Sequence, residues 1–172
     1  KAEAPAVDWT DRPIDWHGVK LNFGCGTNRL EGWENFDSEV DISKRLPFPD
    51  DHADFIYAEH VVEHVTYPEA LAFFKECRRV LKPGGVVRIC VPSVENVMER
   101  ADETYIAFVR KWAPTGDLRG AMHAILFAHG HKAPWTLSLL RTSLFFAGFE
   151  SLVHCEQGQS ERQELKGVEG HH

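Results

Sequence analysis

The sequence has few cysteines and little positive charge, and both shortages narrow the function classes. Four cysteines are spread along the chain without a C-x-x-C pair or a short disulfide spacing, namely Cys25, Cys77, Cys90 and Cys155. The 26 acidic residues outnumber the 19 Lys and Arg residues, which gives a formal net charge of −7 and argues against a nucleic-acid partner. No apolar run approaches the length of a transmembrane helix, and residues 1–7 lack the apolar core of a signal peptide. We therefore expect a cytoplasmic protein that binds neither nucleic acid nor a membrane.

Strand-like and helix-like segments alternate along the 172 residues, a length that suits one domain with its own core. The expected strands are about 19–23, 33–37, 54–58, 86–91 and 149–155 with a stub at 40–42, and the expected helices are 68–82, 94–112, 118–128 and 136–147. Alternation of this kind predicts an α/β fold, a doubly wound and mostly parallel Rossmann-like sheet with helices on both faces.

Three segments fall outside this regular pattern of the predicted single domain, 1–172. Residues 1–18 form an irregular N-terminal arm with two prolines, and residues 113–134 form a cap segment rich in Gly, Pro and His. The polar residues 156–172 are expected to form an edge strand and a mobile C-terminal tail.

Two glycines end the first expected strand and point to a ligand site. Gly24 and Gly26 lack Cβ, so the chain can turn tightly there and a ligand can lie against bare backbone. Asp37 ends the next strand, where its carboxylate is placed to accept hydrogen bonds from ribose hydroxyls. A glycine turn and an acid at the ends of neighbouring parallel strands indicate a nucleoside site.

The segment after the glycine turn argues against a dinucleotide. A pyrophosphate needs a third glycine and a substantial helix whose N-terminus faces the phosphates. Here the turn continues as Thr27-Asn28-Arg29, and only residues 27–32 separate Gly26 from the next strand. The first helix is therefore shortened to one turn at most, which favours a nucleoside ligand without phosphate, such as S-adenosylmethionine.

The order of motifs resembles the class I S-adenosylmethionine-dependent methyltransferases, particularly their small type 11 branch. The matching segments are L-N-F-G-C-G (21–26), N-F-D (35–37), D-I-S-K-R-L-P-F-P-D-D-H-A-D-F-I-Y-A-E-H-V-V-E-H (41–64), F-K-E-C-R-R-V-L-K-P-G-G-V-V-R-I-C-V-P (74–92), H-G-H-K (129–132) and A-G-F-E (147–150). The chain departs from the pattern in its shortened first helix and third strand.

The resemblance implies a methyltransferase whose cofactor is S-adenosylmethionine. Its cofactor-binding residues would be Asn22, Phe23, Gly24, Cys25, Gly26, Asp37, Asp41, Ile42, Glu59 and His60. Gly24 and Gly26 would lie under the methionine part and Asp37 on the ribose. Asp41 and Ile42 would hold the adenine, while Glu59 and His60 would lie beside the sulfonium.

Histidines supply the remaining candidates. His60 is the candidate catalytic residue, as a general base with a pKa suited to removing a hydroxyl proton, or it only lines the pocket. His64, His129 and His131 are candidate substrate-binding residues. The run His60 to His64 also matches the H-x-x-E-H pattern of inverted zinc peptidases, but no third ligand has a supporting context, so we expect no metal.

The favoured function is a methyltransferase acting on a small-molecule acceptor, such as a sugar or another hydroxylated metabolite. Two alternatives remain, a nicotinamide-dependent oxidoreductase and a non-catalytic binding protein with the methyltransferase fold. The oligomeric state does not follow from the sequence.

Overall fold

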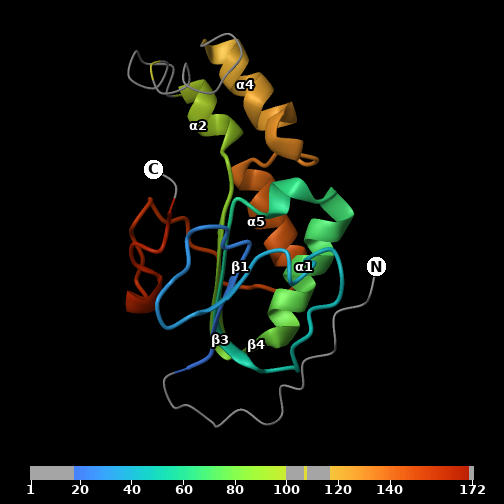
Figure 1. The fold of residues 1–172 in the computed structure, drawn as a ribbon, viewed down its shortest axis with the longest axis vertical. Helices are drawn as coiled ribbons and strands as arrows, with labels where there is room; N and C mark the ends of the chain where they lie inside the picture. Colours follow the sequence, from blue (N-terminus) through green and yellow to red (C-terminus); the bar gives the residue numbers. More distant parts are fainter. Residues whose placement is uncertain (1–17, 100–106, 108–116, 171–172) are drawn as a thin grey trace.

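A computed structural model describes residues 18–99, 107 and 117–170, and its centre is one parallel sheet (Figure 1). The strand order is β2-β1-β3-β4, and every neighbouring pair is parallel. The strands are β1 (Lys20–Phe23), β2 (Glu34–Phe36), β3 (Ala53–Glu59) and β4 (Leu81–Cys90). Residues 24–33 contain no helix and residues 40–42 no strand, so the first helix and the third strand are reduced as the sequence predicts.

Helices follow the expected order along the described chain. They are η1 (Val62–His64), α1 (Tyr67–Val80), α2 (Val94–Glu99), α4 (Leu118–Phe127), η2 (Ala128–Gly130), α5 (Leu137–Phe146) and η3 (Gln163–Leu165). The start of α1 is well specified, because Thr66 and Glu69 form a reciprocal capping box and Pro68 lies in the first turn. The far part of the expected helix 94–112 lies outside the described residues.

One face of the sheet is apolar and is covered by α1 and α5. Residues paired in register on neighbouring parallel strands point to the same face. The rows Leu21–Ile56–Val87 and Phe23–Ala58–Ile89 are both apolar. The ring of Phe23 packs edge-on against Phe73 of α1 at 5.7 Å, and both side chains are fully buried. This face holds the hydrophobic core of the described chain.

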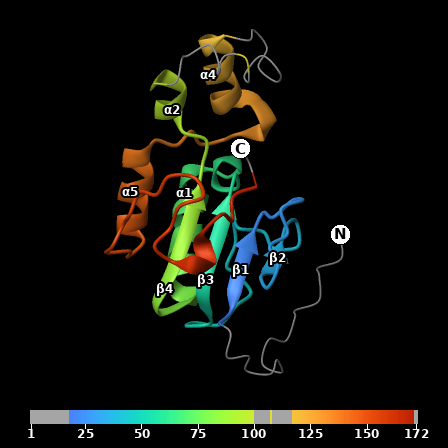
Figure 2. The same ribbon diagram turned by 90° about the vertical axis from the view of Figure 1, so that its left-hand side faces the viewer.

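The opposite face is more polar, although its row Lys20–Phe55–Val86 has two apolar residues, and no described α-helix covers it. Its central row is Asn22–Tyr57–Arg88, and residues 151–170 run across it without forming a strand (Figures 1 and 2). The predicted strand 149–155 and the predicted edge strand within 156–172 are thus absent from the described residues. The segment is also well packed rather than a loose tail, because Val168 and Glu169 are buried.

The described part of the cap segment lies beyond the carboxyl ends of the strands. Helices α2 and α4 stack on each other at the end of the molecule to which β4 leads (Figures 1 and 2). Trp135, which follows the cap, is a core residue packed on Phe74 at 5.8 Å. The predicted N-terminal arm, apart from Gly18, and residue Trp112 lie outside the described residues.

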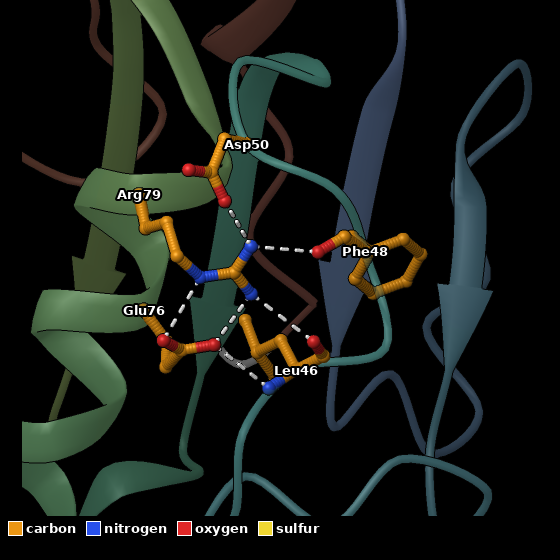
Figure 3. A network of polar contacts seen from close by, with 5 residues as sticks. All are labelled: Leu46, Phe48, Asp50, Glu76 and Arg79. Atoms are coloured by element: carbon orange, nitrogen blue, oxygen red, sulfur yellow. Dashed lines mark hydrogen bonds and ion pairs between the residues drawn. The ribbon is translucent and has the colours of Figure 1, made fainter.

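A polar network joins α1 to the loop before β3 (Figure 3). The Arg79 guanidinium donates to the Leu46 and Phe48 carbonyls at 3.1 and 2.8 Å and to Asp50 Oδ1 at 2.8 Å. It also forms two hydrogen bonds to the Glu76 carboxylate, at 3.0 and 2.6 Å. Arg79 therefore links the two motifs of the resemblance, L-P-F-P-D and R-V-L-K-P-G-G, through one hydrogen-bond network.

Candidate functional site at the carboxyl edge of the sheet

The glycine turn lies at the carboxyl end of β1, in a conformation that favours glycine at both positions. Gly24 has φ of 64° and Gly26 has φ of 46°. A Cβ on Gly24 would lie 2.2 Å from Val61 Cγ2, so this glycine is required by close packing. A Cβ on Gly26 would meet nothing within 4 Å. The backbone at Gly26 is therefore open to a ligand, whereas Gly24 packs closely against Val61.

Asp37 lies beside this turn, at the carboxyl end of the neighbouring strand. Its Oδ1 accepts a hydrogen bond from Gly26 N at 3.3 Å, and the side chain is exposed. A second contact holds the turn against β2, since Cys25 N donates to the Phe36 carbonyl at 3.0 Å. The structure thus brings the turn and the acid together, with a carboxylate still open to solvent.

Asp41 and Ile42, the residues expected at the adenine, are neighbours in the sequence but differ in exposure. Asp41 Oδ1 accepts from Ser43 N at 3.0 Å and from Ser43 Oγ at 2.6 Å, which holds the Asp41 pKa below its usual value. The carboxylate thus closes its own turn, and its other oxygen lies 3.3 Å from Lys44 Nζ. Ile42 is buried in the core, so only its backbone is available to a ligand.

Asn22 and Phe23 serve the sheet. The Asn22 amide donates to the Asn28 carbonyl at 3.0 Å and to Asn35 Oδ1 at 2.9 Å, which ties the loop after the turn to β2. The Phe23 ring points into the apolar core, between Phe36 and Phe73. Their side chains position the turn, and neither faces the open side of Gly26.

Glu59, at the carboxyl end of β3, is in contact with the C-terminal segment. It is buried, and its Oε2 accepts from Gly170 N at 2.9 Å. Two residues earlier, the Val168 carbonyl accepts from the Asn28 amide at 2.9 Å. Residues 168–170 therefore lie between the loop after the glycine turn and the end of β3. The sequence carries no local signal for this contact, because it joins residues more than a hundred positions apart.

The candidate histidines gather next to Glu59. His60 has φ of 53° and its Nδ1 lies 3.1 Å from Oε1 of the buried Glu63. The rings of His64 and His131 meet at 5.0 Å between centroids, and His129 lies 6.1 Å from His131. The structure thus brings together all four histidines that the sequence singled out, and it adds Glu63 among them.

A cavity lies away from these candidate residues. The cavity, of about 450 Å³, is lined by β4, α5 and residues 149–162, and it includes Arg88, Arg141 and Cys155. It lies along the outer edge of β4, away from the glycine turn at the end of β1. It therefore offers no part of the nucleoside site.

Together, a parallel sheet, a glycine turn and an acid at the ends of adjoining strands form the arrangement that is typical of nucleoside-binding α/β proteins. Comparison with known proteins narrows this class. Residues 28–89 match the family model described as "Methyltransferase domain". The ubiquinone/menaquinone biosynthesis C-methyltransferase of Cupriavidus necator is 35% identical over 71 residues, which cover 41% of this chain and 28% of that protein. The demethylmenaquinone methyltransferase of Bacillus velezensis is 27% identical over 113 residues, covering 66% and 47%.

Among solved structures, an S-adenosylmethionine-dependent methyltransferase of Archaeoglobus fulgidus has a similar fold. Its TM-score is 0.51 at 18% identity, over 77% of this chain and 61% of that one. The chain spans less than half the length of the two curated relatives that it matches. The predicted fold is confirmed by this structural likeness, and the match of residues 28–89 to a methyltransferase family model agrees with the resemblance drawn from the sequence. No helix among the described residues is both long and apolar enough to cross a membrane.

Proposed function

We propose that this protein is an S-adenosylmethionine-dependent methyltransferase that acts on a small-molecule acceptor. The observation that carries the proposal is the pairing of the open Gly26 backbone with the exposed Asp37 carboxylate at the ends of β1 and β2. The match of residues 28–89 to a methyltransferase family model and the parallel sheet support the same cofactor. The nicotinamide alternative is disfavoured, because residues 24–33 contain no helix whose N-terminus would face a pyrophosphate.

The residues at the carboxyl edge fit this cofactor on its nucleoside side. Gly24 and Gly26 would support its methionine part, Asp37 would accept hydrogen bonds from the ribose, and the backbone at Ile42 would contact the adenine. Asp41 is a weaker candidate than the sequence alone suggested, because both of its oxygens already have partners. When bound, S-adenosylmethionine supplies a methyl group on a positively charged sulfur.

Glu59 and His60 would lie closest to the transferred group. His60 is partly exposed, with 36% of its side chain accessible, so an acceptor can reach it. A proton leaving an acceptor hydroxyl would pass to His60, while the buried Glu63 carboxylate holds the ring in place through Nδ1. Methyl transfer depends mainly on how the acceptor is positioned. We propose that His64, His129 and His131 line the acceptor side of the site and contribute to this positioning.

The acceptor class follows from charge and from the relatives. The net charge of −7 gives nucleic acid little to bind. The two curated relatives are named for ubiquinone, menaquinone and demethylmenaquinone. We therefore propose a small acceptor that carries an acidic hydroxyl, which both a quinol and a hydroxylated metabolite provide.

One observation favours a second candidate, a non-catalytic binding protein of the same fold. Gly170 N already donates a hydrogen bond to the buried Glu59 carboxylate, which lies next to the position proposed for the sulfonium. A chain in which this contact is permanent would bind no S-adenosyl ligand. The calorimetric experiment below separates the two candidates.

Titration with S-adenosylhomocysteine, followed by calorimetry, tests the proposal. We expect binding, and Asp37→Ala should weaken it by more than about 1 kcal/mol, or about fivefold, because a carboxylate accepting from two hydroxyls is lost. The matched control is Glu150→Ala, which removes an exposed carboxylate far from the glycine turn and should leave the affinity unchanged. Unaltered binding in Asp37→Ala would disprove the ribose assignment, and no binding by the parent chain would favour the second candidate.

A further inference from the structure

A cluster of metal-ligating groups lies beside the proposed methyltransferase site. Glu63, His64 and His131 each offer one ligand atom, and these atoms all lie within 4.8 Å of one another. The cluster joins two segments that are far apart in the sequence, the η1 turn and the irregular residues directly after η2. Because all three groups are side chains that zinc accepts as ligands, the cluster has the composition of a metal site.

Backbone contacts hold the two segments together before any ligand arrives. The Glu63 carbonyl accepts from Lys132 N at 2.7 Å and from Ala133 N at 3.2 Å. Both bonds are made by the two residues directly after His131, and they hold this stretch against η1. The cluster is therefore built into the fold, and it does not depend on long flexible side chains meeting by chance.

The second observation is a buried carboxylate oxygen that lacks a partner. Only 2% of the Glu63 side chain is accessible, and its Oε1 is shared with His60 Nδ1 at 3.1 Å. Its Oε2 is buried and has no hydrogen-bond partner within the described part of the chain. A buried polar atom left in this way costs free energy unless something binds it. A cation between Glu63 and the two imidazoles would satisfy it.

The position of His64 suits a metal ligand. Its ring lies 5.0 Å from the ring of His131, measured between centroids. A hydrogen bond with the Gly130 backbone orients the ring. Metal-binding histidines usually have such a partner on the ring nitrogen that does not bind the metal. Glu63 has a similar orienting partner, because His60 Nδ1 lies 3.1 Å from its Oε1.

We propose that Glu63, His64 and His131 bind one divalent transition-metal ion, for which zinc is the natural probe. Two imidazoles and one carboxylate make a three-ligand set that leaves a fourth position open to water or to a substrate oxygen. This differs from the zinc-peptidase pattern considered from the sequence, which would use His60 and His64 as ligands and Glu63 as a base.

The place of the cluster suggests what the open position binds. His60 links Glu63 to the carboxyl end of β3, where the proposed methyl transfer takes place. An ion there would bind the hydroxyl of an acceptor and lower its pKa. This role in acceptor binding rests on the proposed function, whereas metal binding itself does not.

Metal binding is tested on the whole chain, without an added affinity tag and after dialysis against a chelator. Because His171 and His172 form a competing pair at the chain end, all variants carry His171→Gln and His172→Gln. Calorimetry with Zn²⁺ should show one equivalent bound, and Co²⁺ should give the absorption bands of a four-coordinate site. His131→Gln and Glu63→Gln should each weaken Zn²⁺ binding by at least about tenfold.

The matched control is His154→Gln, which removes an exposed histidine away from the cluster and should leave Zn²⁺ affinity unchanged. Thermal unfolding of each metal-free variant shows that it is folded, and Glu63→Gln replaces His131→Gln if the latter is not. Absence of stoichiometric Zn²⁺ binding, or equal affinity in the ligand variants and the control, would overturn the site. S-adenosylhomocysteine binding is measured in parallel on the metal-free chain, so a failure of the cofactor proposal is seen separately.

Discussion

The two faces of the sheet are built by different means. The face under α1 and α5 is apolar along both of its rows and is covered by regular helices. The opposite face carries Asn22, Tyr57 and Arg88 and is covered by an irregular segment, residues 151–170. Burial of apolar area stabilises the first face with little demand on geometry. The opposite face depends on individual hydrogen bonds and one buried ion pair, so each of its contacts requires particular partner residues.

The Arg88 side chain shows how the polar face is closed. Its guanidinium is only 10% accessible and forms an ion pair with Glu169, which is 5% accessible. It also donates to the Gln159 carbonyl at 2.7 Å. The other Glu169 oxygen accepts from Gly158 N at 3.2 Å. Arg88 thus holds the C-terminal segment against the sheet through polar contacts, whereas the opposite face is covered by helices that bury apolar side chains.

The largest expected effect comes from the apolar face. Phe73→Ala should lower the free energy of unfolding by about 3–5 kcal/mol, because it removes a fully buried ring that packs on Phe23 and leaves a cavity. Urea unfolding followed by circular dichroism measures this change. Phe145→Ala is the control, since that ring is 62% exposed and should change the value by less than about 0.5 kcal/mol. Equal losses in both variants would contradict the assignment of this face as the core.

A somewhat smaller effect is expected on the polar face. Glu169→Gln should cost about 3 kcal/mol, because it leaves the buried Arg88 guanidinium without its counter-charge. The double variant Arg88→Met with Glu169→Leu should cost less than the single change, since no unpaired charge remains buried. The same unfolding experiment applies to both. If Glu169→Gln is neutral, the segment is not held in place by this ion pair.

The smallest expected effect on the free energy of unfolding concerns the polar network of Arg79 and Glu76 on α1. Hydrogen bonds from the Arg79 guanidinium, and one from Leu46 N, hold the pKa of Glu76 below its usual value. A lowered pKa in the folded state stabilises the protein at neutral pH, and this contribution is lost as the pH falls below about 4.5. Glu76→Gln should therefore cost about 1.5 kcal/mol at pH 7.

That difference should shrink progressively when unfolding is measured at pH 5, 4 and 3. Asp50→Asn is the matched control, because Asp50 binds the same guanidinium but its side chain is 69% exposed, so its loss should be smaller. A cost for Glu76→Gln that stays constant down to pH 3 would show that the carboxylate charge does not contribute.

Prediction from sequence succeeded where local pattern and local chemistry agree. The helix expected at 68–82 is α1 at Tyr67–Val80, because its apolar face and capping residues point to these bounds, whereas the strand expected at 86–91 begins earlier, as β4 at Leu81–Cys90. The strands that end at the glycine turn and at Asp37 were predicted within one residue. The nucleoside side of the site follows from these two strands, since parallel neighbours bring their carboxyl ends together.

Prediction failed where a segment depends on distant polar partners. Residues 149–155 read as a strand because they are apolar, yet they form none, and Arg88 instead binds the carbonyls of Glu156 and Gln159. The burial of Glu169 had no local signal either, because its partner is 81 residues away. His131 was predicted as a substrate-binding residue, but its approach to Glu63 and His64 depends on tertiary structure and had no local signal.

The chain's own pattern of apolar residues, glycines and caps determined the alternating strands and helices, the start of α1 and the glycine turn, because each of these depends on neighbours within a few residues. The tertiary structure alone decided what covers the polar face, what contacts Glu59, and which histidines surround Glu63. Those outcomes rest on single hydrogen bonds and ion pairs between distant positions, and such pairs leave no periodic trace in a sequence.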